Sequence, residues 1–220
     1  MIQQQLKNIH SLIEQAKQTP AHQVEIIAVT KQLSVEQTRI VLDAGLQHLG
    51  ENRPQGFLPK VEAFGHEPVW HFIGSLQTRK VRDVIDHIDF LHSLDRMSLA
   101  QEIQKRATKP VKCFIQVNVS GEDSKHGLAV KDVRDFIEQV KPMDKVELVG
   151  LMTMAPLEAS REEIKQQFHQ LRLLRDELRE NLGPEFKELS MGMSGDYELA
   201  VEEGATFIRI GTALVGSLKE

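Results

Sequence analysis

The segment VEIIAVTK at residues 24–31 decides the fold of this chain. Its first seven residues are mostly apolar and rich in β-branched side chains, which is typical of a buried strand. Lys31 stands where this strand ends, and burial there would favour the uncharged amine over the ammonium. An uncharged lysine amine attacks carbonyl groups and forms Schiff bases. The placement indicates a nucleophilic lysine, although a lysine that only caps a strand and reaches water fits the same pattern.

Further strand-like segments alternate with helical patterns along the whole chain. We predict strands at 24–30, 46–50, 69–74, 90–93, 111–119, 146–154, 187–191 and 206–210, and helices at 35–44, 54–63, 76–87, 96–107, 130–140, 160–182 and 196–203. This α/β alternation predicts parallel β–α units, arranged either as a doubly wound open sheet or as a closed barrel. Eight repeats favour the (β/α)8 TIM barrel. Without a linker or a compositional break, we expect one domain over 1–220, with 1–18 forming an amphipathic N-terminal helix that packs against it.

Local signals support two of these helices. Ser34 and Gln37 have the spacing of a capping box, and Gly45 stands where a helix-ending glycine belongs. The helix at 160–182 has one apolar face and one charged face. Arg172 and Asp176 are four residues apart on the charged face, which we interpret as a solvated surface.

Composition excludes several classes of protein. The 220 residues carry a net charge of -5 at pH 7, which argues against a nucleic-acid-binding surface. No apolar stretch is long enough to span a membrane, and the N-terminus lacks a signal-peptide pattern. Cys113 is the only cysteine, so we expect no disulfide, a small buried thiol and a cytoplasmic location. The histidines show no zinc-ligand spacing, so we predict no metal and expect His48 and His71 to be core residues.

The last two predicted strands carry the clearest binding signals. One leads into SMGMSGD at 190–196 and the other into RIGTA at 209–213, so each joins glycine and a hydroxyl residue just before a helix. In barrels, the corresponding two loops frequently bind phosphate. Arg209 alternates with two isoleucines and is predicted to point into the barrel, where it needs an electron-rich partner. That partner is either a protein carboxylate or a ligand atom.

A Schiff-base lysine, a phosphate-binding turn and an inward arginine fit two kinds of ligand. One is a phosphorylated sugar, as in a Schiff-base aldolase that uses no cofactor. The other is pyridoxal 5′-phosphate (PLP), whose aldehyde, phosphate and ring nitrogen match the three features.

Seven motifs in the chain resemble those of the pyridoxal phosphate homeostasis protein family, single-domain relatives of the alanine racemase barrel. They are AVTK at 28–31, GENR at 50–53, WHFIGSLQ at 70–77, QVNVS at 116–120, GLMTM at 150–154, LSMGMS at 189–194 and RIGT at 209–212. They follow the family order over nearly the whole chain, and the set is highly specific.

The resemblance implies a role for each candidate residue. Lys31 would form the internal aldimine with PLP, Asn52 would lie beside the ring, and Arg209 would face the pyridine nitrogen. The phosphate would be held by Ser194, Gly211 and Thr212.

The chain departs from the family just after the lysine. Many relatives carry another lysine or a tyrosine there, whereas this chain continues with Gln32 and Leu33. A neighbouring amine that hands the cofactor on is therefore not expected at that position. Lys125 matches a family loop after the fifth strand, and we interpret it as a solvated lysine in preference to an accessory amine at the barrel mouth.

The resemblance favours a carrier over an enzyme. Racemases of this class need two bases, and the second is a tyrosine on an additional β-domain that we do not expect here. The only tyrosine, Tyr197, is predicted to pack in a helix. Arginine at the ring nitrogen keeps its own proton and makes PLP a poorer electron sink than aspartate does. We therefore expect a non-catalytic protein that stores, buffers and delivers PLP to apoenzymes in intracellular vitamin B6 and amino-acid homeostasis. We expect it to be a monomer, because the barrel has no missing wall that a second subunit must supply. The alternatives are a weak PLP-dependent amino-acid racemase and, less favoured, the aldolase.

Overall fold

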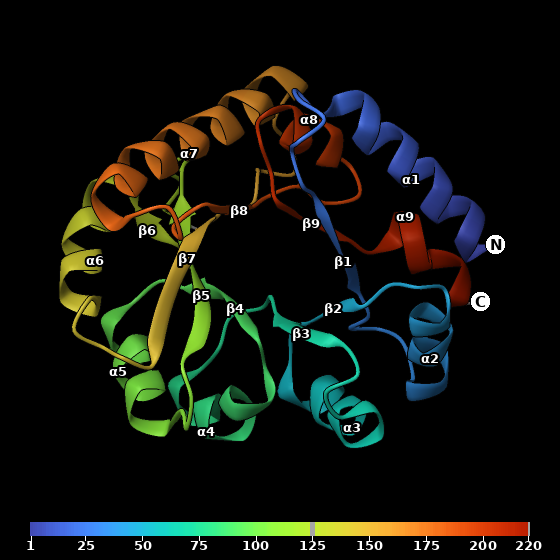
Figure 1. Cartoon of the computed structure of the whole chain (residues 1–220), viewed down its shortest axis with the longest axis horizontal. Helices are drawn as coiled ribbons and strands as arrows, with labels where there is room; N and C mark the ends of the chain where they lie inside the picture. The colour runs from blue at the N-terminus through green and yellow to red at the C-terminus, as the bar shows by residue number, and fades with distance from the viewer. Residues whose placement is uncertain (124–125, 220) are drawn as a thin grey trace.

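The strands of the computed structural model, which describes residues 1–123 and 126–219, form a closed parallel barrel (Figure 1). The barrel strands are β1 (Glu25–Val29), β2 (His48–Glu51), β3 (Val69–Phe72), β4 (Phe90–Leu94), β5 (Val111–Asn118), β7 (Val146–Met152), β8 (Glu188–Ser190) and β9 (Phe207–Ile210). Pairing of β1 with β9 and of β4 with β5 closes the ring. The barrel prediction is confirmed, and every strand predicted from the sequence lies within two residues of its observed bounds.

Helices surround the barrel on its outer side (Figure 1). They are α1 (Ile2–Ala16), α2 (Val35–Asp43), α3 (Pro54–Phe64), α4 (Val81–Val84), α5 (Met97–Arg106), α6 (Val133–Val140), α7 (Arg161–Leu182), α8 (Tyr197–Glu202) and α9 (Thr212–Val215). The predicted N-terminal helix is α1, which buries Ile2, Ile9 and Ile13 and contacts α8 and α9. No helix in the described part of the chain has both the length and the apolar character needed to cross a membrane.

Two local predictions were incomplete. The helix expected at 76–87 is broken into the 3-10 turn Thr78–Lys80, α4 and the 3-10 turn Ile85–His87. Neighbouring β-branched residues bury against the barrel there, and no side chain caps the start of α4, so a regular helix is poorly supported. The two-residue strand β6 (Leu128–Ala129), which pairs with β5 outside the ring, is too short to leave a pattern in the sequence.

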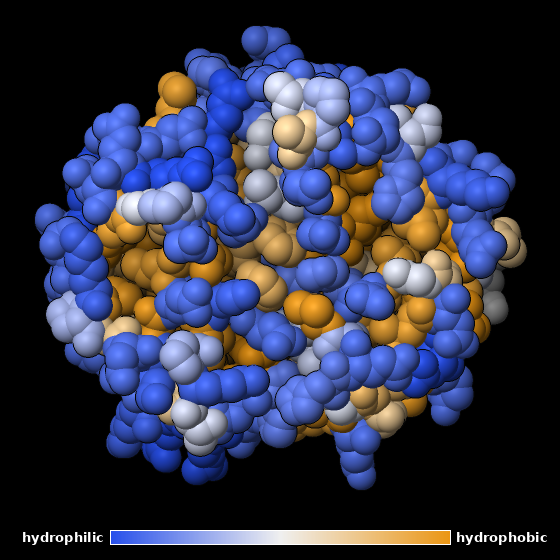
Figure 2. Space-filling view, in the orientation of Figure 1, coloured by the Kyte–Doolittle hydropathy of each residue, from blue (hydrophilic) through white to orange (hydrophobic). Residues whose placement is uncertain are grey.

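Apolar side chains pack in two layers. The larger layer lies between strands and helices and includes Leu49, Trp70 and Phe72. The smaller layer fills the barrel interior and consists of Ile27, Phe114, Val149, Met152 and Phe207. The outer surface is mostly hydrophilic, and apolar residues are visible mainly in recesses inside the ring of helices (Figure 2). The interior is thus a packed core, which leaves binding to the loops at the strand ends.

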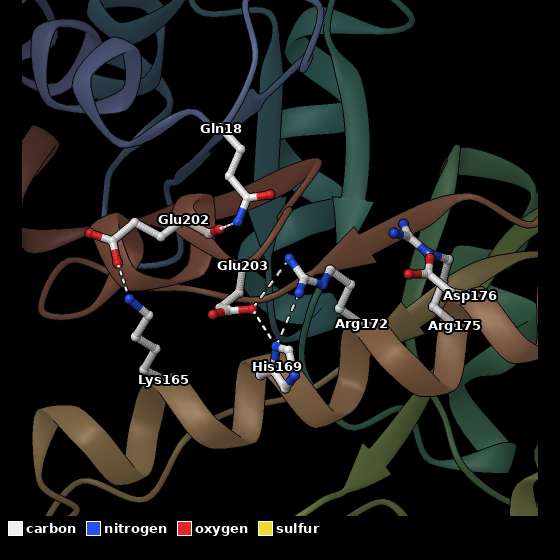
Figure 3. Close-up of polar contacts among 8 residues, drawn as sticks. All are labelled: Gln18, Lys165, His169, Arg172, Arg175, Asp176, Glu202 and Glu203. Carbon is white, nitrogen blue, oxygen red and sulfur yellow. Dashed lines mark hydrogen bonds and ion pairs between the residues drawn. The ribbon is translucent and has the colours of Figure 1, made fainter.

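The capping predictions hold, but the charged face of α7 is more than a solvated surface. Ser34 and Gln37 form the capping box of α2, and Gly45 has a φ of 96°. Arg172 contacts Glu203, which follows α8, with 3.4 Å between nitrogen and oxygen, while Asp176 contacts Arg175 (Figure 3).

The same face of α7 supplies two more partners to the end of α8. Lys165 lies 2.8 Å from the Glu202 carboxylate, and Nδ1 of His169 lies 2.9 Å from that of Glu203 (Figure 3). Carboxylates at a helix C-terminus are disfavoured by the helix dipole, and the cations Lys165 and Arg172 from α7 offset that repulsion. The interpretation of this face as only a solvated surface is therefore incomplete, because Arg172 contacts a carboxylate from a distant segment.

Gly150 permits a close approach between β7 and β8, and we expect Gly150→Ala to destabilise the barrel strongly. A Cβ atom there would stand 1.9 Å from the carbonyl oxygen of Glu188, so the backbone itself would have to move. We expect a loss of about 3 kcal/mol in the free energy of unfolding, the upper end for overpacking. Gly216→Ala is the matched control, since its Cβ would make an ordinary 3.5 Å contact with Thr212. Equal urea midpoints for the two variants would contradict this account.

Candidate functional site

One cavity of about 550 Å³ opens at the carboxyl ends of the barrel strands. The residues singled out from the sequence all line it: Lys31, Asn52, Ser194, Arg209, Gly211 and Thr212. Arg209 lies in β9, and the others follow β1, β2, β8 and β9, which are neighbours in the ring. Parallel strands end at the same edge of a barrel, so residues far apart in the chain meet there.

Lys31 extends from a firmly held strand end. The preceding residue, Thr30, is fully buried and donates a hydrogen bond from Oγ1 to Oε1 of Glu51 over 2.6 Å. The ammonium of Lys60 donates to the same Oε1 over 2.5 Å and to the carbonyl oxygen of Thr30 over 2.6 Å. The buried pair of Lys60 and Glu51 was missed from the sequence, and it fixes the backbone from which Lys31 projects.

The side chain of Lys31 itself is exposed along the cavity wall. The expectation that the strand end would bury this amine is therefore wrong. The burial of this strand ends at Thr30, because the chain leaves the barrel core where the cavity opens. Any removal of the amine from water has to come from a bound ligand.

Arg209 points into the barrel, as its alternation with isoleucines predicts. Only 3% of the residue is exposed, and its guanidinium donates from Nη1 to Ser190 Oγ over 2.6 Å and from Nη2 to the Thr153 carbonyl oxygen over 3.1 Å. Burial lowers the pKa of Arg209 to about 10, and the charge of Asp196 opposes this shift. Both acceptors are uncharged, so the arginine retains donors for an electron-rich ligand atom.

The loops after β8 and β9 meet at the cavity. The backbone N–H of Ala213 donates to Ser194 Oγ over 3.2 Å, which joins the two predicted phosphate-binding turns. Thr212 begins α9 with its side chain exposed, in agreement with the helix start expected there. The hydroxyl groups of Ser194 and Thr212 and the start of α9 thus lie on one side of the cavity.

Asn52 is held on the wall of the cavity by a close backbone approach. A Cβ atom on Gly74 would stand 2.5 Å from the Asn52 carbonyl oxygen, so only glycine fits at that position. The motif WHFIGSLQ therefore contributes to the site through packing, since Gly74 lets the loop after β3 lie against the loop after β2.

A second amine reaches the rim of the cavity from the far end of the sequence. Lys219 lines the cavity, and its ammonium donates to Oε1 of Gln32, the residue where the chain departs from the family pattern. The contact joins positions 187 residues apart, so no local pattern could have revealed it. Lys125, the other amine considered from the sequence, lies outside the described residues.

The side chains that line the cavity suit a ligand with an anionic group and an aldehyde. The described residues that line the cavity include the cations Lys31, Arg209 and Lys219 and no carboxylate, imidazole, thiol or phenol. Tyr197 is buried, as predicted, and burial raises its pKa. The cavity can hold a phosphate and a ring acceptor and can bond an aldehyde, but amines are the only groups lining it that could move a proton. The residues present therefore fit PLP.

Comparison with known proteins agrees with this geometry. The sequence profile of the family described as alanine racemase, N-terminal domain, matches residues 4–219. The pyridoxal phosphate homeostasis protein of Aquifex aeolicus is 42% identical over 199 residues, which cover 89% of this chain and 87% of that protein.

Solved structures show the same relationship. PipY of Synechococcus elongatus without PLP superposes with a TM-score of 0.88 at 35% identity, covering 98% of this chain and all of PipY. The structure of PipY with PLP bound gives a TM-score of 0.86 at 34% identity. An alanine racemase of Clostridium difficile, at 15% identity and a TM-score of 0.74, shares the fold. The chain belongs to the pyridoxal phosphate homeostasis protein family, whose barrel is the one found in the N-terminal domain of alanine racemases.

Proposed function

We propose that this protein binds PLP as an imine on Lys31 and stores, buffers and delivers it without transforming amino acids. In this assignment Arg209 faces the ring nitrogen and Asn52 lies beside the ring. Ser194, Gly211 and Thr212 hold the phosphate. The names of its relatives and the PLP-bound structure of PipY support the choice of ligand.

The observation that carries the non-catalytic proposal is the composition of the cavity wall. A racemase needs bases on both faces of the substrate α-carbon, whereas the described cavity residues offer only the amines of Lys31 and Lys219. Arg209 adds to this, because a guanidinium with a pKa of about 10 remains a hydrogen-bond donor at neutral pH and keeps its proton. A PLP ring nitrogen that accepts from this arginine stays unprotonated, and the unprotonated ring is a weaker electron sink than the pyridinium.

A test of this proposal is proton exchange at the α-carbon of amino acids. We expect PLP-loaded protein in deuterated water to exchange no α-proton across a broad amino-acid panel, because the described cavity offers no carboxylate, imidazole or phenol as a partner base to Lys31. An alanine racemase, assayed in parallel by NMR, is the positive control. Steady exchange that depends on Lys31 would instead support the weak racemase. A protein that took up no PLP but formed an imine with a phosphorylated sugar would support the aldolase.

Delivery is tested separately with an apoenzyme. Loaded protein should restore the activity of a PLP-requiring apoenzyme, and a scavenger of free aldehyde distinguishes the two routes. Reactivation that persists with the scavenger indicates transfer by contact, while its loss indicates release into solution. A failure to reactivate in either condition would contradict delivery.

A further inference from the structure

A continuous row of polar side chains crosses the apolar interior of the barrel beneath Arg209. Nη1 of Arg209 lies 2.6 Å from Ser190 Oγ, and Ser190 Oγ lies 2.8 Å from Nδ1 of His92. Nε2 of His92 lies 2.8 Å from Nδ1 of His71, and Nε2 of His71 lies 2.8 Å from Nδ1 of His48. The row connects the cavity end of the barrel with its opposite end.

Burial disfavours the charged form of the two inner histidines of this row. His71 and His92 are almost completely buried, and their rings stack on Phe90 and Phe114 at centroid distances of 4.6 and 4.3 Å. Burial lowers the pKa of both well below the usual range; the neighbouring histidines add to the effect at His71, and Arg209 adds to it at His92.

His48 ends the row near solvent, with 21% of its side chain exposed. Burial lowers its pKa, while the charges of Glu25 and Asp89 act in the opposite direction.

Donation by Arg209 favours one direction for the hydrogen bonds of the row. A guanidinium can only donate, so Ser190 Oγ accepts from it and directs its own hydrogen to Nδ1 of His92. A neutral histidine that accepts at Nδ1 carries its hydrogen on Nε2, which then donates to Nδ1 of the next ring. The same step repeats from His71 to His48, whose Nε2 lies 3.6 Å from the partly exposed carboxylate of Glu25.

We propose that this row is a positioning relay, in which His92, His71 and His48 hold Ser190 as an acceptor and thereby fix Arg209 for its ligand. The proposal rests on the proposed function only for the identity of that ligand. With the opposite tautomer, His92 would also donate to Ser190, and the serine hydrogen would have no acceptor among these contacts. With the favoured tautomers every hydrogen of the row has an acceptor, and Ser190 is held on both sides, by Arg209 and by His92.

The first test needs no cofactor. Long-range ¹H–¹⁵N NMR of the ligand-free protein at neutral pH should show the Nε2–H tautomer for His48, His71 and His92. The exposed residues His10 and His66 serve as internal references for solvent-averaged rings. In Ser190→Ala, His92 should lose its single tautomer. An Nδ1–H tautomer of His92 in the unaltered protein would overturn the relay, whatever the protein binds.

The second test compares two isosteric replacements of His92. The side-chain oxygen of His92→Asn can occupy the place of Nδ1 and still accept from Ser190, whereas His92→Gln keeps only the contact toward His71. Because one hydrogen bond is at stake, His92→Gln should bind PLP about fivefold more weakly than His92→Asn. Both variants bury an amide, so a purely structural role would shift their urea midpoints and PLP affinities together.

The outcomes separate this inference from the proposed function. Equal PLP affinity of His92→Asn and His92→Gln would overturn the positioning role. If the unaltered protein took up no PLP, the proposed function would fail, and the tautomers in the ligand-free protein would still decide whether the relay exists.

Discussion

Lys31→Ala is expected to lose the borohydride-reducible adduct with PLP completely. The substitution removes the amine that we assign to the aldehyde, while Ser194, Thr212 and Arg209 still line the cavity and should retain part of the phosphate-driven binding. The variant should therefore bind PLP weakly, without the visible absorbance band of an imine. Absorbance spectra before and after borohydride, followed by mass spectrometry of the intact protein, measure both effects.

Peptide mapping sharpens the Lys31 test because a second amine is close by. Lys219 reaches the same cavity rim through Gln32, so it is the residue on which a misassigned adduct would be found. Lys165→Ala, in which the lost lysine pairs with Glu202 on the outer helices, is the matched control and should keep the adduct. A reduced adduct that persists in Lys31→Ala and maps to Lys219 would refute our assignment.

Lys60→Met is expected to be the most destabilising of the charge-removing substitutions. It would leave the carboxylate of Glu51 buried without its cation, and Oε2 of Glu51 already has no hydrogen-bond partner among the described residues. Removing one partner of a buried ion pair costs about 3–5 kcal/mol. For a chain of this size that loss lowers the melting temperature by roughly 10 °C or more. Chemical and thermal unfolding provide the measurement.

A double variant separates the lost pair from the lost packing. In Lys60→Met/Glu51→Leu no charge is left buried, so most of the lost stability should return. The hydrogen bond from Lys60 to the Thr30 carbonyl oxygen is absent from both variants and cancels in the comparison. If Lys60→Met cost less than about 1 kcal/mol, or if the double variant were less stable than the single one, the buried pair would not have the importance we give it.

The barrel could be predicted because its strands are short apolar runs with β-branched residues, and these patterns are local. The same is true of the site residues that stand directly at strand ends, such as Lys31 and Arg209. The broken segment at 78–87 could not be predicted, because burial of Val81, Val84 and Ile85 produces a helical spacing whether or not the backbone is regular.

The contacts that support the site were hidden for a different reason. Lys60 with Glu51, Lys219 with Gln32, and His92 with Ser190 each join segments that no sequence period relates. A histidine within an apolar strand has the same pattern whether it is isolated or part of a row. The exposure of the Lys31 side chain was mispredicted because the sequence shows where a strand ends but does not show that a cavity opens there.

The position of the two termini has a practical consequence for producing this protein. Met1 is 89% exposed and begins the helix that covers α8 and α9, so an affinity tag attached before it would extend into solvent. Lys219, by contrast, lines the rim of the cavity and contacts Gln32, so a tag placed shortly after it would start near the cavity. Ligand titrations are therefore best made with an N-terminal tag, and a crystallisation fusion at the opposite end would crowd the mouth of the barrel.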